Sequence, residues 1–270
     1  MTALCRTAGM SRQSFYKQRH RRQRCQVDEA LVVALVCRER SVQPKLGGRK
    51  LLHLLRQELS ESGVKIGRDR FMETLRNHKL LIHRKVSSAR TTDSRHRFRV
   101  YENLLKDLEL TGAHQAWVSD ITYIRTSEGF LYLSLVMDAF SRAIVGYDSS
   151  DTLEREGALR ALRQSLRQMP CGAGLIHHSD RGSQYCCGDY VQALREAGVR
   201  ISMTQDNHCY ENAKAERLNG ILKQEYGLGS CFGTKREALR AVSEAVNLYN
   251  CRRPHQSLGY ATPMSVHVAA

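Results

Sequence analysis

The spacing of hydrophobic residues changes once along this chain of 270 residues. Before residue 85, apolar positions recur every three to four residues, which is the period of amphipathic helices. From residue 114 onward the period becomes two. In residues 116–124, AWVSDITYI, alternate side chains fall on opposite sides of an extended chain, and Asp120 shares its side with valine, threonine and isoleucine. This alternation predicts a β-strand.

The segment from residue 114 to residue 228 predicts a mixed α/β domain. Its elements follow the order strand, strand, strand, helix, strand, helix, strand, helix. Short turns join the first three strands into an antiparallel meander. The whole order is that of the RNase H-like fold, a five-stranded mixed sheet with helices on both faces. The five strands are expected near residues 116–124, 130–138, 143–147, 175–179 and 199–203.

The first hundred residues predict helices followed by a linker. Residues 4–17 fit two short helices around a turn at Gly9, with Ser11 capping the second helix. Three further helices are typical of a helix-turn-helix region; the alternative is a plain helical hairpin packed on the next domain. We therefore expect five parts: a basic helical segment (1–26), a helix-turn-helix region (27–85), a basic linker (86–113), the RNase H-like core (114–228), and a C-terminal helix and tail (229–270).

The charge of the chain favours a polyanionic partner. Forty-two Lys and Arg against 27 Asp and Glu give a net charge of +15, most of it within residues 1–100. Neutralising phosphates releases counterions and drives association. No run approaches the roughly 18 apolar residues of a membrane span, and no signal-peptide core is present, so we expect a cytoplasmic protein. The nine cysteines form no CxxC pair and predict free thiols instead of structural zinc.

Three acidic residues are candidates for a metal site. Asp120 lies inside the first strand, Asp180 directly follows the fourth, and Glu216 lies on the polar face of the helix that begins near residue 210. Ionised carboxylates about 4 Å apart repel by about 4 kcal/mol per pair at an effective dielectric near 20. Either their pKa values rise or a cation neutralises them. Oxygen ligands suit Mg²⁺ or Mn²⁺, and two such ions about 3.5–4 Å apart stabilise an in-line phosphoryl displacement.

Three features carry a resemblance to a known family. HHSDRGSQY surrounds Asp180, 35 residues separate Asp180 from Glu216, and YNCRRPHQSLGYATP occupies residues 249–263. Together, in this order, they resemble the OrfB-type products of bacterial insertion-sequence transposases, whose catalytic core is similar to that of retroviral integrases. Nearly the whole chain takes part in the resemblance. Asp120, Asp180 and Glu216 match the family's DDE triad.

The resemblance implies metal-dependent DNA cleavage at the ends of an insertion sequence, followed by strand transfer with a 3′-hydroxyl as the attacking group. It assigns both catalysis and metal binding to Asp120, Asp180 and Glu216, with two ions of Mg²⁺ or Mn²⁺ as the cofactor. It also implies that the partners are the element ends and target DNA, a homo-oligomer on DNA, and an upstream-frame (OrfA-type) product or fusion. The implied location is bacterial and nucleoid-associated.

Basic and amide side chains on several segments are candidates for DNA contact. Solvated surface charge is the alternative for the basic ones, and the two arginines of the tail can instead pin it in place. Asn212, one turn before Glu216, can instead position a ligand or the backbone. We expect the rival carboxylate, Asp138, to cap the turn after the second strand. We expect His177 and His178 to be packed or hydrogen-bonded, the alternative being that one orients a water or a phosphate. The candidates for DNA contact are Arg12, Lys17, Arg68, Arg70, Arg95, Arg97, Arg99, Asn212, Lys214, Arg217, Lys223, Arg252 and Arg253.

Two other functions fit parts of the pattern. An RNase H-type nuclease or junction resolvase would cleave DNA without joining it, and a DNA-binding accessory protein would carry an inactive core. The long basic N-terminal region and the C-terminal motif favour transposition over the first alternative. The intact set of three carboxylates argues against the second.

Overall fold

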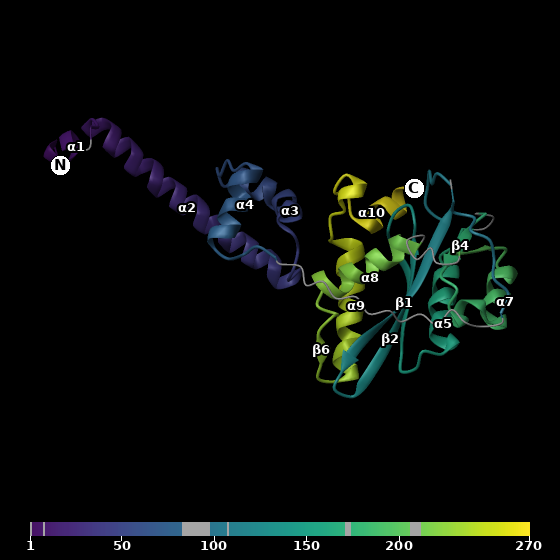
Figure 1. Ribbon diagram of the computed structural model, residues 1–270. Helices are drawn as coiled ribbons and strands as arrows, with labels where there is room; N and C mark the ends of the chain where they lie inside the picture. The colour runs from purple at the N-terminus through teal and green to yellow at the C-terminus, as the bar shows by residue number, and fades with distance from the viewer. Residues whose placement is uncertain (1, 8, 83–97, 107, 171–173, 206–211) are drawn as a thin grey trace. The chain divides into compact units, whose positions relative to one another are not determined.

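The chain divides into two compact units, Met1–His83 and Arg84–Ala270, each with a hydrophobic core of its own (Figure 1). Among the described residues, no helix is both long and apolar enough to cross a membrane. The cysteines in the described part of the chain all carry free thiols, as predicted. The computed structural model describes residues 2–7, 9–82, 98–106, 108–170, 174–205 and 212–270.

Two helices joined by a tight turn open the first unit. α1 (Thr2–Thr7) and α2 (Arg12–Val42) meet where Gly9 adopts a φ of 64°, and the Ser11 side chain caps α2 by accepting a backbone hydrogen bond of 3.0 Å. The sequence predicted this turn and this cap. It also predicted a boundary after residue 26, but α2 runs through that position without a break. No glycine or proline occurs within α2, so nothing in the sequence interrupts the helix.

Two shorter helices pack on the C-terminal half of α2. α3 (Gly48–Glu61) and α4 (Arg68–Asn77) enclose a core of leucines and valines around Phe71. A Cβ at Gly48 would lie 2.6 Å from Met72 Sδ, so the glycine allows α3 to approach α4 closely. These three helices agree with the helical region that the sequence predicts, and its role in DNA binding stays a prediction.

The second unit is organised around a mixed sheet in the order β3-β2-β1-β4-β5. The β1–β2 and β2–β3 pairs are antiparallel, and β4 is parallel to both β1 and β5. This is the predicted fold, with one correction: a sixth strand of two residues, β6, pairs with β1 in parallel. The strands are β1 (Ala116–Thr126), β2 (Gly129–Asp138), β3 (Ile144–Ser150), β4 (Ile176–Ser179), β5 (Arg200–Met203) and β6 (Cys231–Phe232).

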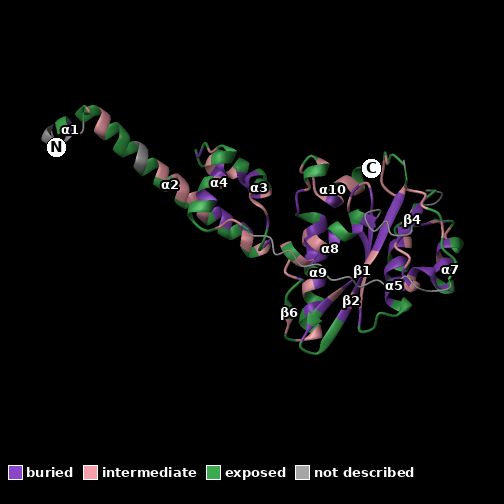
Figure 2. Cartoon of the chain, viewed as in Figure 1, coloured by how far each residue is buried: buried purple, intermediate pink, exposed green. Residues whose placement is uncertain are grey.

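Helices cover both faces of this sheet, as the buried positions show (Figure 2). Trp117 of β1 packs with the helices of one face, whereas its neighbour Val118 packs with those of the other. Alternation along a strand produces these two separate cores. One face carries α5 (Arg155–Leu166), α6 (Ser183–Cys186) and α7 (Gly188–Glu196); the other carries α8 (Ala213–Glu225) and α9 (Lys235–Cys251).

The C-terminal segment belongs to the same core. Five residues of α9 pack in the cluster that also contains α8 and β1, so the expected boundary after residue 228 divides one hydrophobic core. A capping box formed by Thr234 and Glu237 begins α9. Beyond α9 follow a 3-10 turn, η2 (Gln256–Leu258), and α10 (Pro263–Ala269), two elements that the predicted tail did not include.

An ion pair ties the tail to α8. Arg253 is only 2% exposed, and its Nε and Nη2 donate to the two carboxylate oxygens of Glu225 at 2.8 and 3.0 Å. Its guanidinium also lies 5.7 Å from the ring centre of Tyr249. This placement contradicts the predicted DNA contact at Arg253, because burial leaves it inaccessible to phosphate. The neighbouring Arg252 is exposed and stays a candidate.

Substitution of Arg253 by Ala should lower the free energy of unfolding by about 3 kcal/mol. Removing one partner of a buried ion pair leaves the other charge uncompensated, which costs about 3–5 kcal/mol; the 19% exposure of the Glu225 side chain places the effect at the lower end. Urea unfolding measures it, with Arg252→Ala as the matched control. Equal stabilities of the two variants would contradict the structural role given to Arg253.

Candidate active site

Asp120 lies at the middle of β1, the central strand. Its Oδ1 accepts a hydrogen bond from Ile121 N at 2.9 Å, and its Oδ2 accepts one from Asn219 Nδ2 at 2.7 Å. Burial, followed by the negative charge of Asp180 and a smaller contribution from Glu216, raises the pKa of Asp120 to about 7. The charges of two other acidic residues therefore act on Asp120 at this point of the fold.

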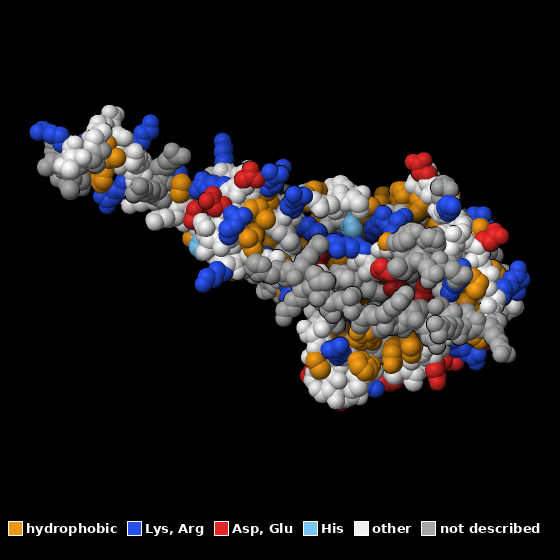
Figure 3. Space-filling model, in the orientation of Figure 1, with side chains coloured by type: hydrophobic (Ala, Val, Ile, Leu, Met, Phe, Trp, Pro, Cys, Tyr) orange, Lys and Arg blue, Asp and Glu red, His pale blue; other side chains and the backbone are white. Residues whose placement is uncertain are grey.

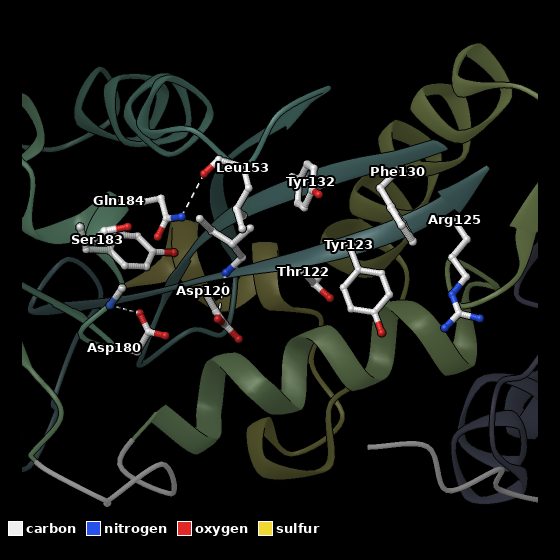
Figure 4. Close-up of a pocket in the computed structure, with 13 residues that line it drawn as sticks. Asp120, Thr122, Tyr123, Arg125, Phe130, Tyr132, Leu153, Asp180, Ser183 and Gln184 are labelled. Atoms are coloured by element: carbon white, nitrogen blue, oxygen red, sulfur yellow. Dashed lines mark hydrogen bonds between the residues drawn. The ribbon is translucent and has the colours of Figure 1, made fainter. Parts of the chain in front are cut away.

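Asp180 follows the last residue of β4. Because β1 and β4 are parallel, the loop after β4 lies at the same edge of the sheet as the residues that follow Val118. Asp180 Oδ1 accepts a hydrogen bond from Gly182 N at 3.0 Å. A Cβ at Gly182 would itself lie 3.0 Å from this oxygen, so the turn has little room for a larger residue. Figure 4 shows the carboxyl groups of Asp120 and Asp180 on the same side of the pocket.

Glu216 lies in the first turn of α8 with an exposed side chain. Its charge contributes to the raised pKa of Asp120, yet it is not among the residues that line the pocket of the two aspartates. Within the described residues, no three His, Cys, Asp or Glu side chains are gathered closely enough to hold a metal ion. The structure thus brings the two aspartates together, with the glutamate on the adjoining helix.

Two asparagines attach α8 to β1. Asn212, immediately before α8, donates from Nδ2 to Ser119 O at 3.1 Å, and Asn219 donates to Asp120. Asn212 is 3% exposed, which contradicts its predicted contact with DNA. Asn219 was not among the candidate residues drawn from the sequence. The signal that could have found it is its spacing of three residues from Glu216, which puts both side chains on one face of the helix.

The pocket runs along an open edge of β1. In the described part of the chain, β4 pairs with β1 only at Ala116–Val118 and β6 only at Arg125–Thr126, so the intervening edge of β1 has no strand partner. A pocket of about 380 Å³ lies along this part of β1 and is also lined by residues of β2 and of the segment after β4. The two aspartates lie at one end, and Tyr123, Phe130 and Arg125 lie at the other (Figure 4).

A buried polar cluster supports the strands that carry the aspartates. His177 Nε2 lies 2.7 Å from Ser119 Oγ and 3.0 Å from Tyr190 OH, and His178 Nδ1 lies 2.8 Å from Ser202 Oγ. The expectation that these histidines are packed and hydrogen-bonded is confirmed. Burial, and then the neighbouring His178, lowers the pKa of His177 to about 3.

Asp138 caps the turn after β2, as predicted. Its Oδ1 accepts from Phe140 N, Ser141 N and Ser141 Oγ at 2.8–3.1 Å, and its Oδ2 accepts from His114 N at 2.7 Å. The residue is fully buried. Because both of its carboxylate oxygens already accept hydrogen bonds, Asp138 stabilises this turn.

The remaining candidates for DNA contact occupy varied environments. Lys214 Nζ lies 3.4 Å from Ala139 O, and Lys223 Nζ lies 4.2 Å from the ring centre of Tyr123; burial lowers the pKa of both lysines. Arg95 and Arg97 fall outside the described residues. Arg70 is half-buried, while Arg12, Lys17, Arg68, Arg99 and Arg217 are exposed. Their contact with DNA stays a prediction.

Two models of the integrase core domain match the sequence, one over residues 111–209 and one over residues 197–263. The chain is 35% identical over 264 residues to the insertion element IS600 uncharacterized 31 kDa protein of Shigella sonnei, covering 96% of each chain. It is 33% identical over 217 residues to the transposase for insertion sequence element IS629 of Shigella sonnei, covering 79% of this chain and 72% of that one. Transposase InsF for insertion sequence IS3A of Escherichia coli K12 is 39% identical over 171 residues, which are 62% of this chain and 59% of that one.

Two solved structures are also similar. The HTLV-2 integrase catalytic core domain in complex with magnesium is 17% identical, with a TM-score of 0.46 over 58% of this chain and 97% of that one. A chain of the simian T-cell lymphotropic virus intasome is 16% identical, with a TM-score of 0.49 over 86% of this chain and 74% of that one.

The strand order and the matched models define residues 111–263 as an integrase core domain with the RNase H-like fold. Similarity to the two Shigella sonnei proteins extends over most of this chain and most of theirs. The chain belongs to the insertion-sequence transposases with a retroviral-integrase-like core.

The lowered pKa of His177 predicts a loss of stability in acid. The unfolded chain takes up a proton near pH 6.5, whereas the folded chain resists it until about pH 3. Stability should therefore be complete above pH 6.5 and fall by about 1.4 kcal/mol per pH unit between these values. His177→Gln should reduce this slope in urea unfolding, because glutamine does not titrate. His20→Gln, at an exposed position, is the control; identical slopes for both variants would contradict the assignment.

Proposed function

We propose that this chain catalyses divalent-metal-dependent cleavage of DNA at the ends of an insertion sequence and joins the cleaved strand to target DNA. The observation that carries the proposal is the convergence of acidic groups on Asp120. Asp120 on the central strand and Asp180 line the same pocket. Burial raises the pKa of Asp120 most, followed by the charge of Asp180 and, to a smaller extent, that of Glu216. Family membership supports a polynucleotidyl transferase. The nearness of the acidic groups supports a reaction at the carboxyl edge of the sheet.

The residues at this edge fit Mg²⁺ or Mn²⁺. Asp120, Asp180 and Glu216 offer oxygen ligands only, which such hard cations prefer. A cation would also relieve the repulsion that raises the pKa of Asp120. The Oδ1 of Asn219 is buried beside Asp120 and has no hydrogen-bond partner in the described part of the chain. This oxygen can therefore still accept a hydrogen bond within the site. When bound, two ions supply stabilisation of the attacking and leaving oxygens of a phosphoryl displacement.

The chain's own groups hold and orient the reacting parts. Asn219 fixes Oδ2 of Asp120 and so sets the direction of that carboxylate. Gly182 N does the same for Oδ1 of Asp180. The exposed Glu216 stands on the adjoining helix and can turn toward the aspartates. Lys223, further along α8, lies beside the pocket and offers a positive charge to a phosphate there.

The partner that fits these features is DNA. The basic excess of the sequence lies mainly within residues 1–100, which include the helical unit, and Figure 3 shows Lys and Arg side chains along that unit on the face in view. We infer that this region binds element ends while the core acts on them. A homo-oligomer bridging two ends, an upstream-frame partner and a bacterial, nucleoid-associated location belong to the same proposal.

A strand-transfer assay with the element's own terminal DNA, target DNA and Mg²⁺ tests this function. The wild-type chain should give joined products. Asp120→Asn, Asp180→Asn and Glu216→Gln should each abolish cleavage, because each removes one anionic ligand. DNA binding, measured by gel shift, should be largely retained because no basic group is lost.

Asp189→Asn is the matched control, since this aspartate is exposed on α7 and is not among the residues that line the pocket. It should cleave and join like the wild type. Nicked but never joined DNA would favour a nuclease or resolvase, and binding without any cleavage would favour an accessory protein with an inactive core. Activity retained by one of the three variants would remove that residue from the site.

A further inference from the structure

The end of the pocket away from the aspartates is an aromatic surface. Tyr123 of β1 lies directly opposite Tyr132 of β2, and the rings of Tyr123 and Phe130 pack edge to face with their centres 5.6 Å apart. Leu153, in the loop before α5, completes it. We call these four side chains the aromatic shelf. Figure 4 shows the three rings along the two strands, on the far side of the pocket from Asp180.

The apolar side chains of the aromatic shelf are more exposed to solvent than those of a hydrophobic core. Phe130 is 48% exposed and Leu153 is 42% exposed, whereas Tyr123 and Tyr132 are half-buried. Figure 3 shows hydrophobic side chains on the face in view beside the β1–β2 hairpin. Apolar groups that line a pocket and remain open to solvent indicate a binding surface more often than a core.

Positive charges border the shelf. Lys223 Nζ lies 4.2 Å from the centre of the Tyr123 ring, and the guanidinium carbon of Arg125 lies 6.0 Å from it. A cation over a ring face leaves its charge available to an anion above. The pocket therefore contains three kinds of group in succession: carboxylates at Asp120 and Asp180, aromatic rings, and cations.

We propose that the aromatic shelf binds an unpaired nucleobase of the DNA strand whose phosphate lies at the carboxylates. The proposal rests on the proposed function and names a substrate feature of that site. Tyr123 follows Asp120 by three positions along β1, a rise of about 10 Å, so a base rotated out of the duplex can reach the rings while its sugar-phosphate stays near the aspartates. Stacking on aromatic side chains stabilises unpaired bases regardless of their sequence.

Other occupants match this succession of groups less well. An acidic peptide would be repelled by Asp120 and Asp180 at one end of the pocket. A basic peptide would be repelled by Arg125 and Lys223 at the other. A nucleotide meets all three surfaces, because its phosphates suit the cations and a metal-bound carboxylate site, and its base suits the rings.

Base-dependent binding to the full-length chain tests the proposal without requiring catalysis. The probes are a short oligothymidylate and an abasic oligonucleotide with the same number of phosphates, compared by competition in EDTA and in Ca²⁺. The wild type should bind the base-containing probe about tenfold more tightly, the value expected for one stacked base. The Tyr123→Ala/Phe130→Ala double variant should lose this preference. Leu239→Ala, at a similarly exposed position on α9, should keep it.

The outcomes separate this proposal from the proposed function. Equal affinity of the wild type for the two probes would contradict base binding by the aromatic shelf. A preference that survives in the double variant would also contradict it, because the bases would then stack elsewhere. A preference lost only in the double variant supports the shelf even when the strand-transfer assay yields no joined product. In that case the function fails while the base-binding surface stands. Tyr123→Phe with Phe130→Tyr should restore the preference, because both rings are kept.

Discussion

The second unit is organised around the carboxylate of Asp120, which is held inside the sheet close to two other acidic groups. Asp120 loses hydration on β1 and gains the repulsion of Asp180 and Glu216, both of which disfavour its charged form. Two hydrogen bonds, from Ile121 N and Asn219 Nδ2, partly offset this cost. The electrostatic cost that remains is relieved when a divalent cation binds beside the carboxylates or when a carboxyl group is protonated.

The scaffold around Asp120 explains how this arrangement persists. β1 pairs with β2 along ten residues, and its two faces are packed into separate hydrophobic cores. The buried cluster of His177, Ser119 and Tyr190 fixes β4 against β1 just before Asp180. Asn212 and Asn219 attach α8, the helix that carries Glu216, to β1. Arg253 ties Glu225, the last residue of α8, to the tail. Hydrogen bonds from several elements thus hold the strands and the helix that carry the three acidic residues.

Much of this architecture follows from the sequence alone. Alternation in residues 116–124 and the apolar run of β2 predict the central strands, because one buried face requires a period of two. The position of Asp180 after a short apolar run predicts its place at the sheet edge. Asp138 was correctly expected to cap a turn, since aspartate accepts backbone hydrogen bonds there.

Other features depend on tertiary contacts that a linear pattern does not carry. Arg253 follows another arginine, and only the burial of one of them beside Glu225 distinguishes an internal ion pair from a DNA contact. β6 has two residues, too few to show a period. The role of Asn219 depends on the distance between α8 and β1. The open edge of β1 results from where β4 stops pairing.

We propose that Asp120, Asp180 and Glu216 share a metal ion, whereas among the described residues Glu216 lies apart from the pocket of the two aspartates. A crystal structure with Mn²⁺, located by its anomalous scattering, tests this sharing of ligands. We expect ions with oxygens of all three carboxylates at about 2.1 Å, the Asn219–Asp120 hydrogen bond retained, and the Glu216 side chain turned toward the aspartates. Mn²⁺ bound elsewhere, or bound to the aspartates with Glu216 still directed to solvent, would contradict it.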